Sequence, residues 1–263
     1  MKYCSLFWRF TTPENDNSSI IYGTIHLSTP ESLTYWKYVQ DFLDDYDTVY
    51  TESSLDESSA KQLQMHTLLK QPLQYSDFIS QRRWEKMRKA AIKYCSTELN
   101  HLKPLHPLFI IAQLQFALLK DGVGIPLDQM IWNYAASHGK VTSGIETSSE
   151  QIDILNQMDI SGLYHQLNRM LKNVSKTRKA LTKIQQLYVH QDIHGLYKKS
   201  KQSLGRDKGL LISKRNHTMA SRLLSIHNRR ASFFSFGAGH LAGGEGVLRI
   251  LKKKGALLES IKV

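Results

Sequence analysis

The chain alternates short apolar runs with long stretches of helical periodicity. The apolar runs are rich in aromatic and β-branched residues and are bounded by residues that favour turns, which is typical of strands. Between them, apolar residues recur every three or four positions, which predicts amphipathic helices. The six predicted strands span residues 5–10, 19–27, 48–53, 140–146, 232–239 and 257–263.

Helical periodicity is most continuous in two tracts, at about residues 55–125 and 150–228. Thr147 or Ser148 is a candidate N-cap for the second tract, in which the helical pattern continues with few breaks. Strands that alternate with helices favour an α/β fold with a central mixed or mostly parallel sheet and helices on both faces. We therefore predict a single domain over residues 1–263, in which the two tracts are long helical insertions that form a lid.

Four of the predicted strands end near a residue that binds metals or transfers protons. His26 and His240 each close a Gly-x-x-His sequence, and Glu52 and Glu146 close two other strands. The carboxyl ends of strands in an open α/β sheet are where sites assemble, so we expect these four side chains to share a cleft. Two histidines and two carboxylates suffice to bind a divalent ion and to leave positions open for water and substrate.

Each of these four residues also has a structural interpretation. A histidine after a strand often makes a structural hydrogen bond, and a glutamate there often caps the next helix. This alternative applies best to Glu146, because the sequence TSSEQ begins a predicted helix directly after it. The coincidence of four residues of compatible chemistry at four strand ends favours a functional site.

Charge and composition narrow the classes of partner. The chain has 263 residues, a formal net charge of +12 and 41% hydrophobic residues. The basic residues concentrate in the second helical tract, between apolar positions at helical spacing, which is typical of solvated helix faces. No helix-turn-helix, basic-zipper or RNA-binding sheet motif accompanies them, so we predict no nucleic-acid partner.

The sequence favours a cytoplasmic protein. No apolar run reaches the length of a transmembrane span, and the N-terminal pattern is that of a first strand and not of a signal peptide. The two cysteines, Cys4 and Cys95, show no zinc-binding spacing and suit a reducing compartment.

Six segments spread over nearly the full length match the sequence pattern of a known family. The two Gly-x-x-His motifs, with an Arg-Asn pair between them, make this pattern specific. The segments are LFWRF, YGTIHLS, YTES, LDQMIWNYAASHGKVTSGIETSSEQ, KRNHTMASRLL and SFFSFGAGHLAGGEGVLRILKKKGALLESI. On these residues the chain resembles the TraB/GumN family, which is related to the Tiki metalloproteases and more distantly to erythromycin esterase and the ChaN haem-binding lipoproteins.

The resemblance implies an α/β fold of the erythromycin esterase and ChaN type and a hydrolase, most simply a peptidase that depends on a divalent ion such as Mn²⁺, Co²⁺ or Zn²⁺. It implies that His26, Glu52 and His240 hold the metal ion and that Glu146 and Arg215 complete the cleft. In such a site Glu146 would be the general base, and Arg215 would stabilise the oxyanion of a tetrahedral intermediate. The alternative for Arg215 is a buried ion pair that only orients a carboxylate.

Other polar residues near these motifs receive supporting roles. Asn216 and Asp128 are expected to orient the site residues or to cap helices. His217, His138 and His106 lie on helical or loop stretches without a partner at ligand spacing, so we expect structural or surface roles for them.

Three functional interpretations stay open at this point. The first is a metal-dependent peptidase with a peptide or small-molecule substrate. The second is a protein that binds a peptide or a haem-like ligand without cleaving it. The third is a metal-independent, esterase-like hydrolase in which a histidine alone activates water.

Overall fold

The centre of the protein is a mixed six-stranded sheet with the order β4-β3-β5-β2-β1-β6. The structure is a computed structural model that describes residues 4–26, 29–70, 73–119, 124–203 and 209–263. The neighbouring strands β4, β3, β5 and β2 are parallel, whereas β1 is antiparallel to both β2 and β6. The strands are β1 (Phe7–Thr12), β2 (Asn15–Thr24), β3 (Thr48–Ser53), β4 (Val141–Glu146), β5 (Phe233–Gly237) and β6 (Leu257–Ile261).

Helices cover both faces of this sheet, as the alternation of strands and helices predicts. On one face, the ring of Phe7 lies 5.5 Å from that of Phe42 in α1 (Trp36–Asp44). On the other face, the ring of Phe10 lies 4.2 Å from that of His227, which ends α10. The helices on the sheet are α1, α5 (Leu127–Ser137), α10 (Arg215–His227) and α11 (Val247–Lys253). The α/β architecture with a mixed sheet is thus confirmed.

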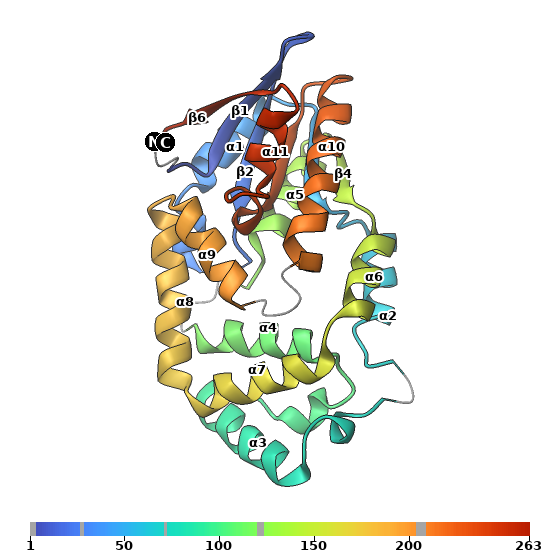
Figure 1. Ribbon diagram of the computed structural model, residues 1–263, viewed down its shortest axis with the longest axis vertical. Coiled ribbons are helices and arrows are strands. Elements are labelled where there is room, and N and C mark those ends of the chain that lie inside the picture. The colour runs from blue at the N-terminus through green and yellow to red at the C-terminus, as the bar shows by residue number, and fades with distance from the viewer. Residues whose placement is uncertain (1–3, 27–28, 71–72, 120–123, 204–208) are drawn as a thin grey trace.

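The remaining helices lie outside the sheet, and α3, α4, α7 and α8 among them supply a second apolar core. Trp84, Leu99, Leu114 and Leu167 are fully buried in it. Figure 1 shows these helices beyond the carboxyl ends of the parallel strands, with α8 and α9 along one side and α2 and α6 along the other. The helices are α2 (Glu57–Met65), α3 (Gln81–Cys95), α4 (Pro107–Leu118), α6 (Ser148–Gln157), α7 (Ile160–Lys172), α8 (Val174–Val189) and α9 (Ile193–Ser203).

The second helical tract is more broken than its periodicity predicts. Within the described residues it divides into α6, α7, α8, α9, a π-helical segment (Gly209–Lys214) and α10. Two of the breaks are aspartate caps: Asp159 accepts a hydrogen bond from the amide of Gly162 at 3.0 Å, and Asp192 accepts one from Gly195 at 2.9 Å. An N-cap residue has non-helical backbone angles, so each aspartate ends one helical run and starts the next.

The helices and the cysteines are the features that would show a membrane span or a disulfide bond. None of the helices in the described ranges combines the length and the apolar character of a membrane span. Both cysteines are free, Cys4 at the surface and Cys95 in the second core.

A buried pair of tyrosines connects the helical part to the sheet. The hydroxyl groups of Tyr22 in β2 and Tyr188 in α8 hydrogen-bond to each other, and both side chains are fully buried. Burial raises the pKa of both phenols, so both stay neutral. The pair therefore stabilises the position of α8 against the sheet only as long as both hydroxyls are present.

We expect Tyr22→Phe or Tyr188→Phe to lower the free energy of unfolding by about 1–3 kcal/mol, because each leaves the partner hydroxyl buried with one hydrogen bond fewer. The double variant should lose less than the sum of the two single losses. Urea unfolding of the four proteins measures this coupling. Strictly additive losses would show that the two hydroxyls do not interact.

Candidate functional site

The four predicted strand-end residues come together at one edge of the sheet. Glu146 is the last residue of β4, and Glu52 is the next to last residue of β3. His26 lies two residues beyond β2, and His240 ends a short 3₁₀ turn after β5. Because β4, β3, β5 and β2 are parallel neighbours, their carboxyl ends bring these side chains to the same edge.

The two Gly-x-x-His motifs end their strands earlier than predicted. β2 ends at Thr24 and β5 at Gly237, so neither histidine belongs to a strand, and Leu27 lies outside the described residues. The reason is a close crossing of the chain. A β-carbon on Gly23 would lie only 2.5 Å from the side chain of Leu241, in the turn that carries His240. Glycine thus lets the turn after β5 pack directly against β2.

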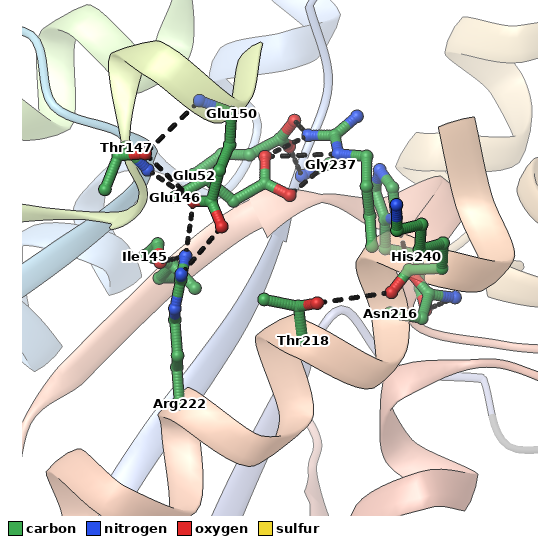
Figure 2. A network of polar contacts seen from close by, with 12 residues as sticks. Glu52, Ile145, Glu146, Thr147, Glu150, Asn216, Thr218, Arg222, Gly237 and His240 are labelled. Atoms are coloured by element: carbon green, nitrogen blue, oxygen red, sulfur yellow. Dashed lines mark hydrogen bonds and ion pairs between the residues drawn. The ribbon is translucent and has the colours of Figure 1, made fainter. Parts of the chain in front are cut away.

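A buried arginine joins the two carboxylates. Arg215, the first residue of α10, donates from Nε to the carboxylate oxygens of Glu146 at 2.8 and 3.1 Å. Its Nη2 donates to Glu146 Oε2 at 2.6 Å and also to Glu52 Oε1. The side chains of Arg215, Glu52 and Glu146 are only 14%, 12% and 3% exposed. Figure 2 shows this network beside Gly237 and His240.

In the ion cluster of Arg215, Glu52 and Glu146, the charges of Arg215 and Glu52 persist at neutral pH. Burial alone would raise the pKa of Glu52, but Arg215 and the two histidines outweigh burial and hold that pKa well below its ordinary value. Burial likewise disfavours the charged guanidinium of Arg215, and the two carboxylates outweigh it, so the pKa of Arg215 is raised. Glu52 is therefore an ionised acceptor and Arg215 a permanent donor.

Gly237 forms the floor of a space between the two histidines and Glu52. Its amide donates to Glu52 Oε2 at 2.9 Å. A β-carbon on Gly237 would lie 3.4 Å from Glu52 Oε2, 3.6 Å from His26 Nε2 and 3.6 Å from His240 Cδ2. Two imidazoles and one carboxylate thus border a space that any larger residue at this position would fill.

The hydrogen bonds of His240 determine its tautomer. Its Nδ1 lies 2.6 Å from Asn216 Oδ1, and the amide nitrogen of Asn216 donates to the carbonyl of Glu245 at 2.5 Å. Because Oδ1 can only accept, Nδ1 of His240 carries the hydrogen and Nε2 keeps its lone pair. Burial lowers the pKa of His240 to about 4, so the ring is neutral at pH 7.

His26 is oriented in the same way from the other side. Its Nδ1 lies 3.3 Å from Asp128 Oδ2, in the first turn of α5. The hydrogen bond to Asp128 holds the pKa of His26 above its ordinary value, although 70% of the His26 side chain is exposed to screening solvent. Both histidines are thus held through Nδ1 by a side-chain oxygen, as metal-binding histidines commonly are.

The imidazole and carboxylate groups are of the types that bind a divalent ion, but they are not arranged as a complete set of metal ligands. Among the residues that the structure describes, no group of three His, Cys, Asp or Glu side chains is placed to hold a metal ion. Glu52 is occupied by Arg215 and by the amide of Gly237. Two oriented imidazoles, an ionised carboxylate and a space above a glycine nevertheless match the ligand types of Zn²⁺ and Mn²⁺ sites.

The remaining polar residues considered in the sequence either contact one of the two site histidines or lie outside the site. Asn216 and Asp128 contact His240 and His26, as described above. His217 is at the surface and lies 2.7 Å from Glu245. His138 ends α5, and His106 caps α4 by accepting from the amide of Leu108 at 3.3 Å.

The ion pair between Arg222 and Glu150 was not predicted from the sequence. Arg222, two helical turns after Arg215, donates to both carboxylate oxygens of Glu150 at 2.7 Å and to the carbonyl of Ile145 at 2.8 Å. Thr147 and Glu150 form the capping box of α6, so Thr147 and not Glu146 caps this helix. The sequence signal for Glu150 is its position three residues after the threonine.

A small pocket opens beside the ion cluster. Its volume is about 180 Å³, and Glu52 and Arg215 are among the residues that line it. The other lining residues come from α2, α4, α6 and the residue after α6. A larger hollow of about 1030 Å³ runs along α8, but no residue of the ion cluster lines it.

Comparison with known proteins points to one family. The model of the TraB/PrgY/gumN family matches residues 6–260. A curated relative, a metalloprotease TIKI homolog from Nematostella vectensis, is 26% identical over 192 residues, which cover 61% of this chain and 41% of the relative. The chain therefore spans less than half the length of that relative. No solved structure matches the chain.

We expect Arg215→Met to lower the free energy of unfolding at pH 7.5 by about 3–5 kcal/mol, because it leaves two buried carboxylates without their partner. At pH 5.5 the loss should be smaller. Without the guanidinium, the carboxylate pKa values of the folded variant rise above those of the unfolded chain, so the folded state takes up protons as the pH falls and the penalty is relieved.

Urea unfolding at both pH values measures this difference. Arg222→Met is the matched control, because Arg222 is also on α10 and pairs with a glutamate, but is 34% exposed. It should lose less stability, with little dependence on pH. An equal loss at both pH values in Arg215→Met would contradict the electrostatic account.

Proposed function

The chain belongs to the TraB/PrgY/gumN family, and on this premise we propose that it is a hydrolase that cleaves a peptide bond with the help of a divalent metal ion. One observation carries the proposal: Nε2 of His26, the ring of His240 and the carboxylate of Glu52 border a single space over Gly237. The relative that is called a metalloprotease supports the same reaction class.

The proposed ligands are Nε2 of His26, Nε2 of His240 and the carboxylate of Glu52, with Mn²⁺, Co²⁺ or Zn²⁺ as the ion. When bound, such an ion supplies a water of lowered pKa and polarises the substrate carbonyl. Glu52 is the anionic member of this set, because its pKa is held well below its ordinary value. The amide of Gly237 and the side chain of Arg215 keep Glu52 in one orientation.

Glu146 and Arg215 have separate roles in this proposal. Glu146 accepts a proton, as a buried carboxylate whose orientation is held by two donors of one guanidinium. Arg215 stabilises negative charge that develops on the substrate oxygen, since it stays protonated at every working pH. Asn216 and Asp128 act as positioning residues, because each holds one imidazole through Nδ1.

The tautomer of His240 also supports a second candidate. A neutral, buried imidazole with a lone pair on Nε2, close to Arg215, is what a metal-independent hydrolase needs to activate water. The two candidates differ in whether hydrolysis survives complete removal of metal.

We expect purified protein to bind a divalent ion and to cleave peptides, and we expect a chelator to remove both properties until Mn²⁺, Co²⁺ or Zn²⁺ is restored. His26→Ala and His240→Ala should lose bound metal and cleavage while the fold stays largely intact, because site residues beyond strand ends contribute less to stability than core packing does. Mass spectrometry of bound metal and a mixed peptide pool supply the measurements. His217→Ala, a surface change, serves as control.

Each other outcome selects a different function. Cleavage that persists in the chelator supports the metal-independent hydrolase. Retained haem absorbance without cleavage supports a binding protein. Wild-type turnover in either histidine variant would show that the Gly-x-x-His motifs are structural.

We expect Gly237→Ala to fold normally and to lose metal and activity. Its backbone angles, φ −51° and ψ 127°, suit alanine, and the new methyl group would lie no closer than 3.4 Å to its neighbours. The free energy of unfolding should therefore change by less than about 1 kcal/mol. The methyl group nevertheless fills the space between His26, Glu52 and His240.

Bound metal, cleavage and urea unfolding are compared with those of Gly244→Ala, where a β-carbon would meet nothing within 4 Å. Normal metal binding by Gly237→Ala would show that the ion does not use this space.

A further inference from the structure

The pocket beside the ion cluster is lined by six apolar side chains together with Gln151, Glu52 and Arg215. We propose that it receives one apolar side chain of the substrate, so that the preferred substrates are peptides with leucine, methionine or phenylalanine next to the cleaved bond. This inference rests on the proposed hydrolase function. Apart from Glu52, the residues that line this pocket come from the helical tracts and not from the sheet.

Apolar side chains from three separate helical elements meet in this pocket. Leu63 comes from α2, Leu108 and Phe109 come from α4, and Ile154 and Met158 come from α6 and the residue that ends it. Each of these five side chains is only partly buried, so each presents apolar surface to the cavity. Such surface is removed from water when an apolar group enters, which favours its binding.

The size of the pocket limits the occupant to one side chain. A dry cavity of about 150 Å³ lined by similar residues holds a benzene ring. The pocket here, at about 180 Å³, accommodates one aromatic ring or one branched aliphatic chain. It is smaller than the roughly 300–1,000 Å³ of pockets that enclose a whole small molecule. It is therefore suited to one side chain of a larger substrate.

The charged lining residues determine how the substrate lies. Glu52 and Arg215 line the pocket and also belong to the ion cluster. An apolar side chain in the pocket therefore places the adjoining backbone beside the ion cluster. Glu52 and Arg215 already pair with each other, so a charged side chain would lose its water among the apolar lining residues, and an alanine would leave most of the space empty.

The test compares peptides that differ only at the residue next to the cleaved bond. We expect kcat/KM for leucine, methionine and phenylalanine to exceed that for alanine, aspartate or lysine by roughly 10- to 100-fold. Leu63→Trp should fill the pocket and reverse the preference toward alanine. This variant is expected to fold, because α2 contains no buried residue.

Met65→Trp is the matched control, since Met65 lies on the same helix and is 69% exposed. It should keep the preference of the unaltered protein. Equal kcat/KM for apolar, small and charged residues would overturn the pocket assignment and leave the hydrolase proposal standing.

A second readout does not need turnover. In protein labelled with ¹³C in the methionine methyl groups, the Met158 signal is assigned by its absence in Met158→Leu. N-acetyl-leucine amide should shift this signal, N-acetyl-serine amide should not, and Leu63→Trp should abolish the shift. A leucine-specific shift without any peptide cleavage supports the pocket and overturns the hydrolase. A Met158 signal that does not respond to the leucine amide overturns the pocket.

Discussion

The architecture of the site depends on one electrostatic constraint. Two carboxylates at the ends of the neighbouring parallel strands β3 and β4 are buried together, and a single guanidinium compensates them. Because Arg215 begins α10, the pairing fixes the start of this helix over the carboxyl edge of the sheet. The next residue, Asn216, then reaches His240 and selects its tautomer. One helix start therefore organises the acids and one of the two imidazoles.

The two parts of the fold contribute different properties to the same place. The sheet supplies charged and proton-transferring groups, because parallel strands end together and glycine permits the close crossing of β2 and the turn after β5. The helical tracts supply apolar walls through α2, α4 and α6. The tyrosine pair between β2 and α8 stabilises the connection between these parts. The charged groups and the apolar walls are thus supplied by separate layers that meet at Glu52 and Arg215.

The sheet and the strand-end residues were predictable because short-range patterns encode them. The run of phenylalanines in β5 and the Gly-x-x-His motifs are local signals, and parallel strands necessarily bring their carboxyl ends together. Arg215 was singled out only through the family resemblance. A basic residue in a basic helical tract has the pattern of a solvated face, and its burial depends on carboxylates that are 69 and 163 residues away in sequence.

The helix breaks and the pocket differ in whether the sequence contains a signal for them. Asp159 and Asp192 begin the related sequences DISGLY and DIHGLY, so the caps that divide the second tract carry a readable signal that helical periodicity alone overlooks. The pocket has no such signal. Leu63, Phe109 and Met158 are ordinary apolar residues of three different elements, and only their docking creates a cavity.

The most direct test of the account is anomalous X-ray diffraction from crystals of the protein grown with Mn²⁺. We predict one strong peak over Gly237, at roughly 2.0–2.2 Å from Nε2 of His26, Nε2 of His240 and a carboxylate oxygen of Glu52. An empty space over Gly237 at saturating Mn²⁺, with the two imidazoles still held only through their Nδ1 atoms, would contradict the central claim that these residues form a metal-dependent hydrolytic site.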